Sequence, residues 1–477
     1  MRSGAVKAIL LLLTFLFSAW ISTTQQSPTI AKAQSGAIVY LPLILTQNNN
    51  PLEITGTRIN VPHFNFWRNA AIAWFGQVNP TDNYADIRIG YSNEALLVDV
   101  HIFDRLVWYD TKPSLGDLTA WDAVTLYLNT EGNQADTLDE HAFRFVAQYR
   151  WWENAADYQA SYQGSSVGWQ LVSVPITSTT FYQGDVPNNN SDDRGWNAIF
   201  EIPFSSLGLT AAPQEGSLWG LGLAVHDRDD EAGTPIVKQT WLPGMSSSDP
   251  STWGKIHFGL PDFTPPQATN LQTVRIRHNL NGELVQDANV GGDTTCGEPF
   301  NPDFFNGWGD ANYAGSVDLN VQNQGNLGDW PCFSKVYITF PLDSIPPDKM
   351  IVSAELVLYQ FGNSDPSQAS DSLIQVLTVG QDWDETTITW NNAPLALENV
   401  SQATVEPLLD YPGLPGIERR WDVGRAASQA YESGIPLRLA LYSADMAMHS
   451  GKYFNSSDVD DYMPEAKPAL LITYGDP

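Results

Sequence analysis

The sequence predicts an all-β protein made of two antiparallel β-sandwich domains, jelly-roll-like in form, that follow a signal peptide. Three observations predict this class: short segments of alternating apolar and polar residues, turn-forming Gly, Pro, Asn and Asp between them, and no long segment with helical periodicity. A period of two places alternate side chains on opposite faces of a strand. Many short strands of this kind are typical of a sandwich of two antiparallel sheets.

The N-terminus begins with Arg2 and Lys7, and an apolar run covers residues 8–21. This is the pattern of a secretory signal peptide, which we place at 1–33. The run is short for a membrane-spanning helix of about 20 apolar residues, although an uncleaved anchor is the alternative. We therefore predict a secreted, extracellular protein without a membrane span. Residues 34–53 are expected to be a linker, and the sequence assigns no role to its apolar segment 37–45.

Alternating runs first occupy residues 54–260, for example 95–103 (ALLVDVHIF) and 123–128 (AVTLYL). The Pro-rich string PDFTPP marks a linker at 261–271, and the pattern then resumes over 272–477. The two predicted domains account for nearly all of the chain that follows the signal peptide.

Charge limits the possible partners. The chain has 54 acidic against 24 basic residues and a formal net charge of −30, so it should repel nucleic acid. An anionic polysaccharide would also be repelled unless bound Ca²⁺ or a local basic patch intervened. Acidic loops supply the oxygen ligands that Ca²⁺ prefers, so a structural Ca²⁺ ion is one interpretation of them, and solvated acidic turns are the alternative. The candidate Ca²⁺ ligands are Asp227 and Asp229 in one domain, and Asp287 and Asp310 in the other.

The two cysteines, Cys296 and Cys332, are predicted to form a disulfide, because a lone pair in an oxidising compartment is most simply explained in this way. Closing this loop would stabilise the domain by about 3–4 kcal/mol.

The first domain resembles the family 9 carbohydrate-binding modules and the related DOMON-like sandwiches. The matching strings stand in the family's order: NEALLVDVHIFD at 93–104, WDAVTLYLN at 121–129, WNAIFEIPFSSLGL at 196–209 and DPSTWGKIHF at 249–258. The resemblance implies a sugar held between two Trp faces with the help of an Arg. Trp121 and Arg144 match the first Trp and the Arg, whereas the second Trp would fall near Ser247 and the family's Glu is Thr125.

Four further aromatic residues are candidate platforms for a sugar ring, since C–H groups of a sugar pack on an exposed aromatic face. Trp108 and Tyr109 lie in a predicted loop, and Trp151 and Trp152 follow a predicted strand. Adjacent strand residues face opposite sides, so one of the latter two should point outward.

The second domain resembles the DNRLRE-type domains, which are akin to family 96 carbohydrate-binding modules. The most specific string is WDETTITWNNAP at 383–394, and KVYITFPLDSIP at 335–346 and PEAKPALLITY at 464–474 also match. Family members occur on secreted, polysaccharide-directed bacterial proteins. Within the string, Asp384 and Glu385 are adjacent and would face opposite ways on a strand, so we interpret it as a structural corner.

No catalytic motif stands out: the chain has no Gly-x-Ser-x-Gly elbow, no His-Glu-x-x-His and no phosphate loop. We therefore predict a secreted, non-catalytic polysaccharide-binding protein that acts near the cell surface or near secreted glycan-active enzymes. Three alternatives stay open: a structural or adhesive surface protein without glycan specificity, an accessory to a polysaccharide lyase or hydrolase with cryptic activity, and a haem protein that uses Met245 with a histidine.

Overall fold

Alternation along the strand β4 (Ala95–Phe103) shows how the local sequence builds the fold. The computed structural model describes residues 56–132, 136–234, 236–292, 304–327, 332–460 and 463–477. In β4, one apolar core buries Leu96, Val98, Val100 and Ile102. The residues between them face the other side of the sheet. The predicted all-β class is confirmed.

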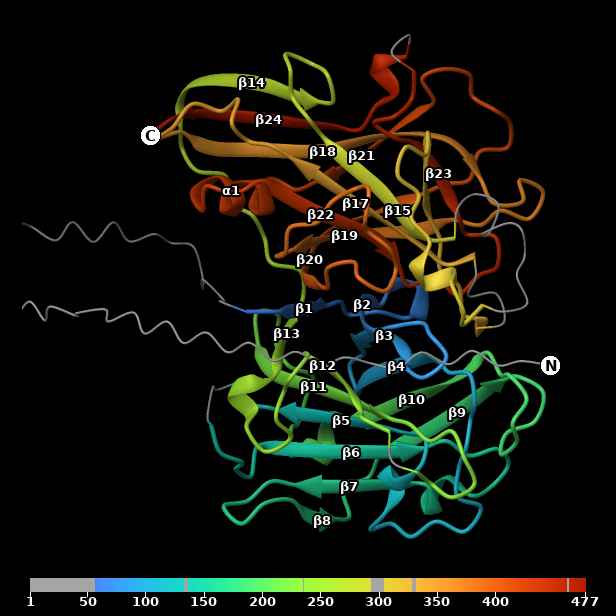
Figure 1. Ribbon diagram of the computed structural model, residues 1–477. Coiled ribbons are helices and arrows are strands. Elements are labelled where there is room, and N and C mark those ends of the chain that lie inside the picture. The colour runs from blue at the N-terminus through green and yellow to red at the C-terminus, as the bar shows by residue number, and fades with distance from the viewer. Residues whose placement is uncertain (1–55, 133–135, 235, 293–303, 328–331, 461–462) are drawn as a thin grey trace, which may run out of the picture. The chain divides into compact units, whose positions relative to one another are not determined.

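The N-terminal sandwich consists of two sheets (Figure 1). One sheet has the order β1 (Arg58–Val61), β13 (Gly254–Phe258), β11 (Leu218–His226), β5 (Ala123–Asn129), β6 (Ala142–Gln148), β7 (Gln159–Gln163) and β8 (Gln170–Val172), and β12 (Gln239–Trp241) pairs with β11. The other has the order β2 (Ala71–Gly76), β3 (Tyr84–Tyr91), β4, β10 (Gly195–Pro203) and β9 (Thr177–Gln183). Within the described residues every strand pair here is antiparallel except β1 with β13.

The C-terminal sandwich also has two sheets. The first has the order β14 (Thr269–Arg277), β24 (Ala469–Asp476), β18 (Met350–Asn363), β23 (Lys452–Asn455) and β16 (Asp318–Val321), and β21 (Ile417–Asp422) pairs with β18. The second has the order β15 (Gln286–Gly291), β17 (Ser334–Phe340), β22 (Leu437–Ser443), β19 (Ser372–Val379) and β20 (Ala396–Val405).

Helical structure is sparse. The described residues hold one α-helix, α1 (Gly424–Glu432), whose Ala426 and Ala427 pack into the C-terminal core. Short 3₁₀ turns lie at η1 (Trp67–Asn69), η2 (Leu118–Ala120), η3 (Ala155–Asp157), η4 (Phe204–Leu207), η5 (Pro250–Thr252), η6 (Trp308–Asp310) and η8 (Pro464–Ala466). None of the described helices has the length and apolar character needed to cross a bilayer. The predicted signal peptide and the apolar segment 37–45 lie outside the described residues.

The two sandwiches pack on each other through sheet faces and belong to one compact unit that begins at Thr55. Trp74 and Phe103, from β2 and β4, share an apolar cluster with Tyr337, Trp390 and Tyr442 of the C-terminal sandwich. The β2–β3–β4 sheet is therefore covered on both sides, by its own core and by the second sandwich.

A buried carboxylate, Asp86 of β3, is fully hydrogen-bonded within this interface. It accepts hydrogen bonds from Tyr84 Oη (2.7 Å), from Tyr442 Oη (2.9 Å) and from Asn323 Nδ2 (3.0 Å). Buried polar groups are tolerated when they are paired in this way. Since two of the donors come from the C-terminal sandwich, the network fixes the position of one sandwich on the other.

Candidate functional site

The outward face of β5, β6 and β7 carries the first candidate site. Tyr127 pairs with Arg144 across β5 and β6, and Arg144 pairs with Tyr162 across β6 and β7. Cross-strand partners project from the same face of a sheet, and the intervening residues Leu126 and Phe145 lie in the core. These three polar and aromatic side chains therefore stand together on the outside of the sandwich.

Arg144 lies among aromatic rings on this face. Its guanidinium carbon is 3.7 Å from the centre of the Tyr162 ring and 5.6 Å from that of Trp169. Trp169 is half-buried and stacks on Trp253, with ring centres 6.5 Å apart and planes at 7°. An arginine held flat against aromatic rings presents its remaining N–H groups in a fixed direction.

Trp169 lies near the position at which the family's second Trp was expected and at which this sequence has Ser247. Its Nε1 donates a hydrogen bond of 3.0 Å to the carbonyl oxygen of Ser247, the position near which the family's second Trp would fall. The sequence did not single out Trp169, because the residue reaches this place from the loop before β8, which is a different part of the chain. Only the strand order β5–β6–β7–β8 brings it there.

Trp121 and Thr125 lie at the start of β5. Trp121 is half-buried, and a Cβ atom built on Gly233 would lie 3.6 Å from its ring, so the 230–234 loop borders one edge of the indole. Thr125 Oγ1 lies 3.0 Å from His226 Nε2. A hydroxyl and an imidazole thus occupy the position of the family's Glu.

The other predicted aromatic platforms differ sharply in exposure. Trp108 and Tyr109 are only 8% and 6% exposed, so the expected loop platform has no free ring face. Hydrogen bonds hold this loop against the sandwich: Trp108 N donates to Asp122, and Tyr109 Oη donates to Glu153 at 2.9 Å. Trp152, by contrast, is 83% exposed, and its ring stacks on half-buried Trp151 with centres 5.9 Å apart.

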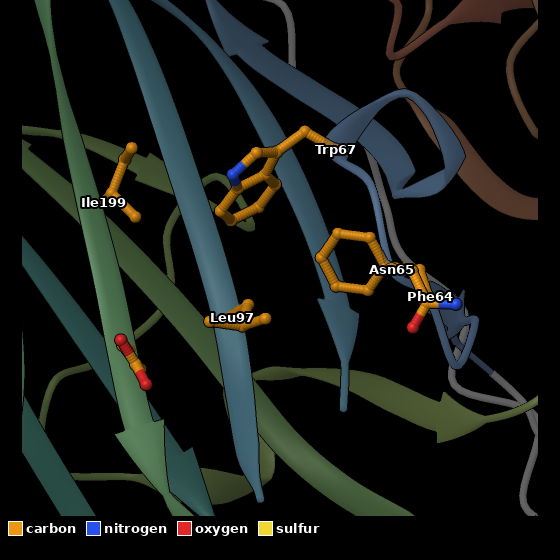
Figure 2. Close-up of a pocket in the computed structure, with 6 residues that line it drawn as sticks. Phe64, Asn65, Trp67, Leu97 and Ile199 are labelled. Atoms are coloured by element: carbon orange, nitrogen blue, oxygen red, sulfur yellow. The ribbon is translucent and has the colours of Figure 1, made fainter. Parts of the chain in front are cut away.

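A pocket of about 220 Å³ opens on the opposite sheet of the N-terminal sandwich. Figure 2 shows the Trp67 indole beside Leu97 and Ile199. Asn65 and Glu201 add polar groups to its lining. The pocket lies on β4 and β10, so it is separate from the Arg144 face.

Three buried carboxylates form a candidate metal centre. Asp104 follows β4, Asp122 precedes β5 and Asp227 follows β11, and one oxygen of each lies within 4.8 Å of the others. Asp227 was predicted as a ligand, whereas Asp104 and Asp122 were missed. They could have been found from the position of all three acids at strand ends.

One oxygen of this carboxylate group accepts no hydrogen bond and could bind a cation. Asp122 accepts from the backbone N–H groups of Trp108 (2.6 Å) and Arg228 (2.8 Å), whereas Asp227 Oδ1 is buried and accepts no hydrogen bond. Burial raises the pKa of Asp227 to about 7, and the charge of Asp229 adds to this shift. Oxygen ligands at this spacing fit Ca²⁺. The pKa of Asp229 itself is raised to about 6, mainly by burial.

The predicted cation site of the C-terminal sandwich is not brought together in the same way. Asp287 is buried and accepts a hydrogen bond from Ser457 N at 2.8 Å, and Asp310 accepts one from Asn391 Nδ2 at 3.0 Å. Among the described residues the two do not belong to one carboxylate group that could hold a metal. Cys296 lies outside the described residues; its predicted partner Cys332 is not a free thiol, and the pairing stays a prediction.

The WDETTITWNNAP string forms turns and buried packing. Thr386 N donates to Asp384 Oδ1 at 2.8 Å, as in a side-chain-capped turn. Trp390 is 3% exposed. These contacts agree with the interpretation of a structural corner. Met245 packs in an apolar cluster with Tyr127 and Trp253.

This geometry defines a class: a two-sandwich β-protein with an aromatic and cationic sheet face. Residues 306–431 match the model of carbohydrate-binding module family 96, which supports a carbohydrate-binding role and confirms the resemblance of the C-terminal domain. A search of curated proteins finds no match.

Solved structures similar to the chain include a family 9 carbohydrate-binding module from Caldicellulosiruptor kristjanssonii in complex with cellotriose. It is 16% identical, with a TM-score of 0.32, over 44% of this chain and 99% of that one. A second is a putative carbohydrate-binding protein from Bacteroides uniformis, which is 13% identical, with a TM-score of 0.33, over 43% of this chain and all of that one (100%).

Proposed function

We propose that the chain is a secreted, non-catalytic polysaccharide-binding protein whose N-terminal sandwich holds a sugar on the outer face of β5, β6 and β7. The observation that carries the proposal is the grouping of Arg144 with Tyr162 and Trp169 on one sheet face, at 3.7 and 5.6 Å from its guanidinium. Apolar ring faces with a few fixed hydrogen-bond donors are what sugar recognition requires. Thr125, which lies between the core residues Val124 and Leu126, extends the same face along β5, and Trp121 lies just before this strand.

A second platform within the same function is the Trp151–Trp152 pair. One indole of this stacked pair is 83% exposed, so the pair offers an open aromatic face to a sugar ring. The pair lies beyond the C-terminal end of β6 and is therefore separable from Arg144 by mutation.

The proposal includes a structural Ca²⁺ ion held by Asp104, Asp122 and Asp227. Three mutually close, buried carboxylates repel each other, and a divalent cation would remove that repulsion and give the free Asp227 Oδ1 a partner. In this role Ca²⁺ connects the end of β4 to the start of β5 and the end of β11.

The experiment is affinity electrophoresis of the mature protein in gels that contain one polysaccharide each, with Ca²⁺ or with chelator. Retardation lost in Trp121→Ala assigns the sheet face, and retardation lost in Trp152→Ala assigns the exposed pair. Tyr411→Ala is the matched control, because Tyr411 is a 65% exposed aromatic residue of the C-terminal sandwich. Unchanged mobility in every glycan would refute the proposal and favour a structural or adhesive surface role.

A further inference from the structure

Two cations on the sugar face have no acidic partner. Neither Arg144 nor Lys238 forms an ion pair in the described part of the chain, although acidic residues outnumber basic ones by 54 to 24. Arg144 Nε is moreover buried without a hydrogen-bond partner. A buried guanidinium N–H without a partner, on a face that carries a second cation, points to a ligand that supplies hydrogen-bond acceptors.

The strand register brings Lys238 to the same face. Gln239 of β12 pairs with Val225 of β11, so the preceding residue, Lys238, lies beside His226. His226 in turn pairs with Ala123 of β5 and contacts Thr125. Lys238 is therefore separated from Arg144 by β11 and β5, and the Thr125 hydroxyl of β5 lies between them.

The two cations act on each other. Burial lowers the pKa of Lys238, and the charge of Arg144 lowers it further. A pair of like charges held on one face is costly by itself, and an anion placed between them would relieve the repulsion. Asp227, which follows β11, is buried in the carboxylate group of the candidate metal centre.

We infer that the sheet face binds an acidic sugar residue, with Arg144 and Lys238 contacting its anionic group and Tyr162 and Trp169 contacting its ring. This inference rests on the proposed function and specifies the substrate class. The shared chemistry is a negatively charged sugar, which could be a uronate or a sulfate ester. Charge-assisted hydrogen bonds from Arg to such a group are both strong and directional.

The test is isothermal titration calorimetry of the full chain with galacturonate oligomers and with the same oligomers methyl-esterified, which have the same rings without the charge. Dextran sulfate and dextran form the second arm, which separates sulfate from carboxylate. We expect the charged member of one pair to bind at least about tenfold more tightly than its neutral partner, the loss expected for one charge-assisted contact.

The variants are Lys238→Gln and Arg144→Gln, with Lys112→Gln as the control, since Lys112 is an exposed lysine elsewhere on the same sandwich. The first two should each reduce binding of the acidic oligomer about tenfold and leave the neutral one unchanged. Thermal melting of each variant shows whether it has folded.

Equal affinity for charged and neutral oligomers would overturn the inference while leaving the proposed function intact. Binding of the acidic oligomer that Lys238→Gln and Arg144→Gln do not weaken would also overturn it. No binding in either arm would also overturn the inference, whereas the affinity electrophoresis with other polysaccharides tests the proposed function separately.

Discussion

Lys335 of the C-terminal sandwich donates a hydrogen bond of 3.0 Å to Tyr84 Oη of the N-terminal sandwich. The ammonium is fully buried and lies 3.7 Å from the centre of the Trp390 ring and 4.4 Å from that of Trp74. Burial lowers its pKa well below the usual value, and the charge of Asp86 acts in the opposite direction. Because Tyr84 also donates to Asp86, the two buried ionisable side chains are linked through one phenol across the interface.

The first prediction concerns this linkage. Lys335→Met and Asp86→Asn each remove one of the two buried side chains that Tyr84 links. Breaking a buried pair by removing one partner typically costs about 3–5 kcal/mol, so each variant should unfold at a clearly lower urea concentration. The double variant should lose less than the sum of the two, measured as a double-mutant cycle. Strictly additive losses would show that the two charges do not interact.

The second prediction concerns the metal centre. Ca²⁺ at about 100 times its dissociation constant should stabilise the protein by about 2.7 kcal/mol relative to the same protein in chelator. Calorimetry should also find one bound ion per chain. Asp227→Asn should abolish both effects, because it removes the carboxylate that has a free oxygen. Glu231→Gln, an exposed acid in the same loop, should leave both unchanged. A wild-type melting temperature insensitive to Ca²⁺ would contradict the assignment.

The third prediction concerns pH. Burial, and then the neighbouring Asp458, raise the pKa of Glu385 to about 7. Between about pH 5 and 7 the folded protein then holds a proton that the unfolded chain has released, so this group's contribution to stability falls as pH rises. Glu385→Gln cannot ionise and should lose less stability over this window than the wild type. The measurement is the urea midpoint of wild type and Glu385→Gln at each pH between about 5 and 7. The control is Glu406→Gln, because Glu406 is exposed. Parallel pH profiles for wild type and Glu385→Gln would contradict the prediction.

The fourth prediction separates Trp169 from Trp253. Trp169→Ala removes a ring that lies on Arg144, and we expect about tenfold weaker glycan binding, equivalent to about 1.4 kcal/mol. Its stability loss should be modest, because Trp169 is half-buried. Trp253→Ala should instead mainly lower the melting temperature, since Trp253 is 3% exposed. If Trp169→Ala binds glycan as tightly as the wild type, Trp169 does not form a wall of the site.

Some site residues could be found from sequence and others could not. Trp121 and Arg144 were predicted as candidate sugar-binding residues because they stand within recognisable strand motifs. Trp169 and Lys238 reach the same face from a loop and from just before a short strand, and a single sequence does not show which strand pairs with which. Trp108 and Tyr109 look like loop aromatics, yet hydrogen bonds from this loop to Asp122 and Glu153 bury them.

The sequence by itself determined the β-class of both halves, because alternation with a period of two is a local property of an extended backbone. It also determined the acidic surface and the strings that resemble two carbohydrate-binding families. Only the tertiary structure decided that Asp104, Asp122 and Asp227 meet, and that Asp86 and Lys335 are buried together between the sandwiches. The proximity of these residues depends on the strand order and on which sheet face the second sandwich covers. Both are determined by contacts between residues far apart along the chain.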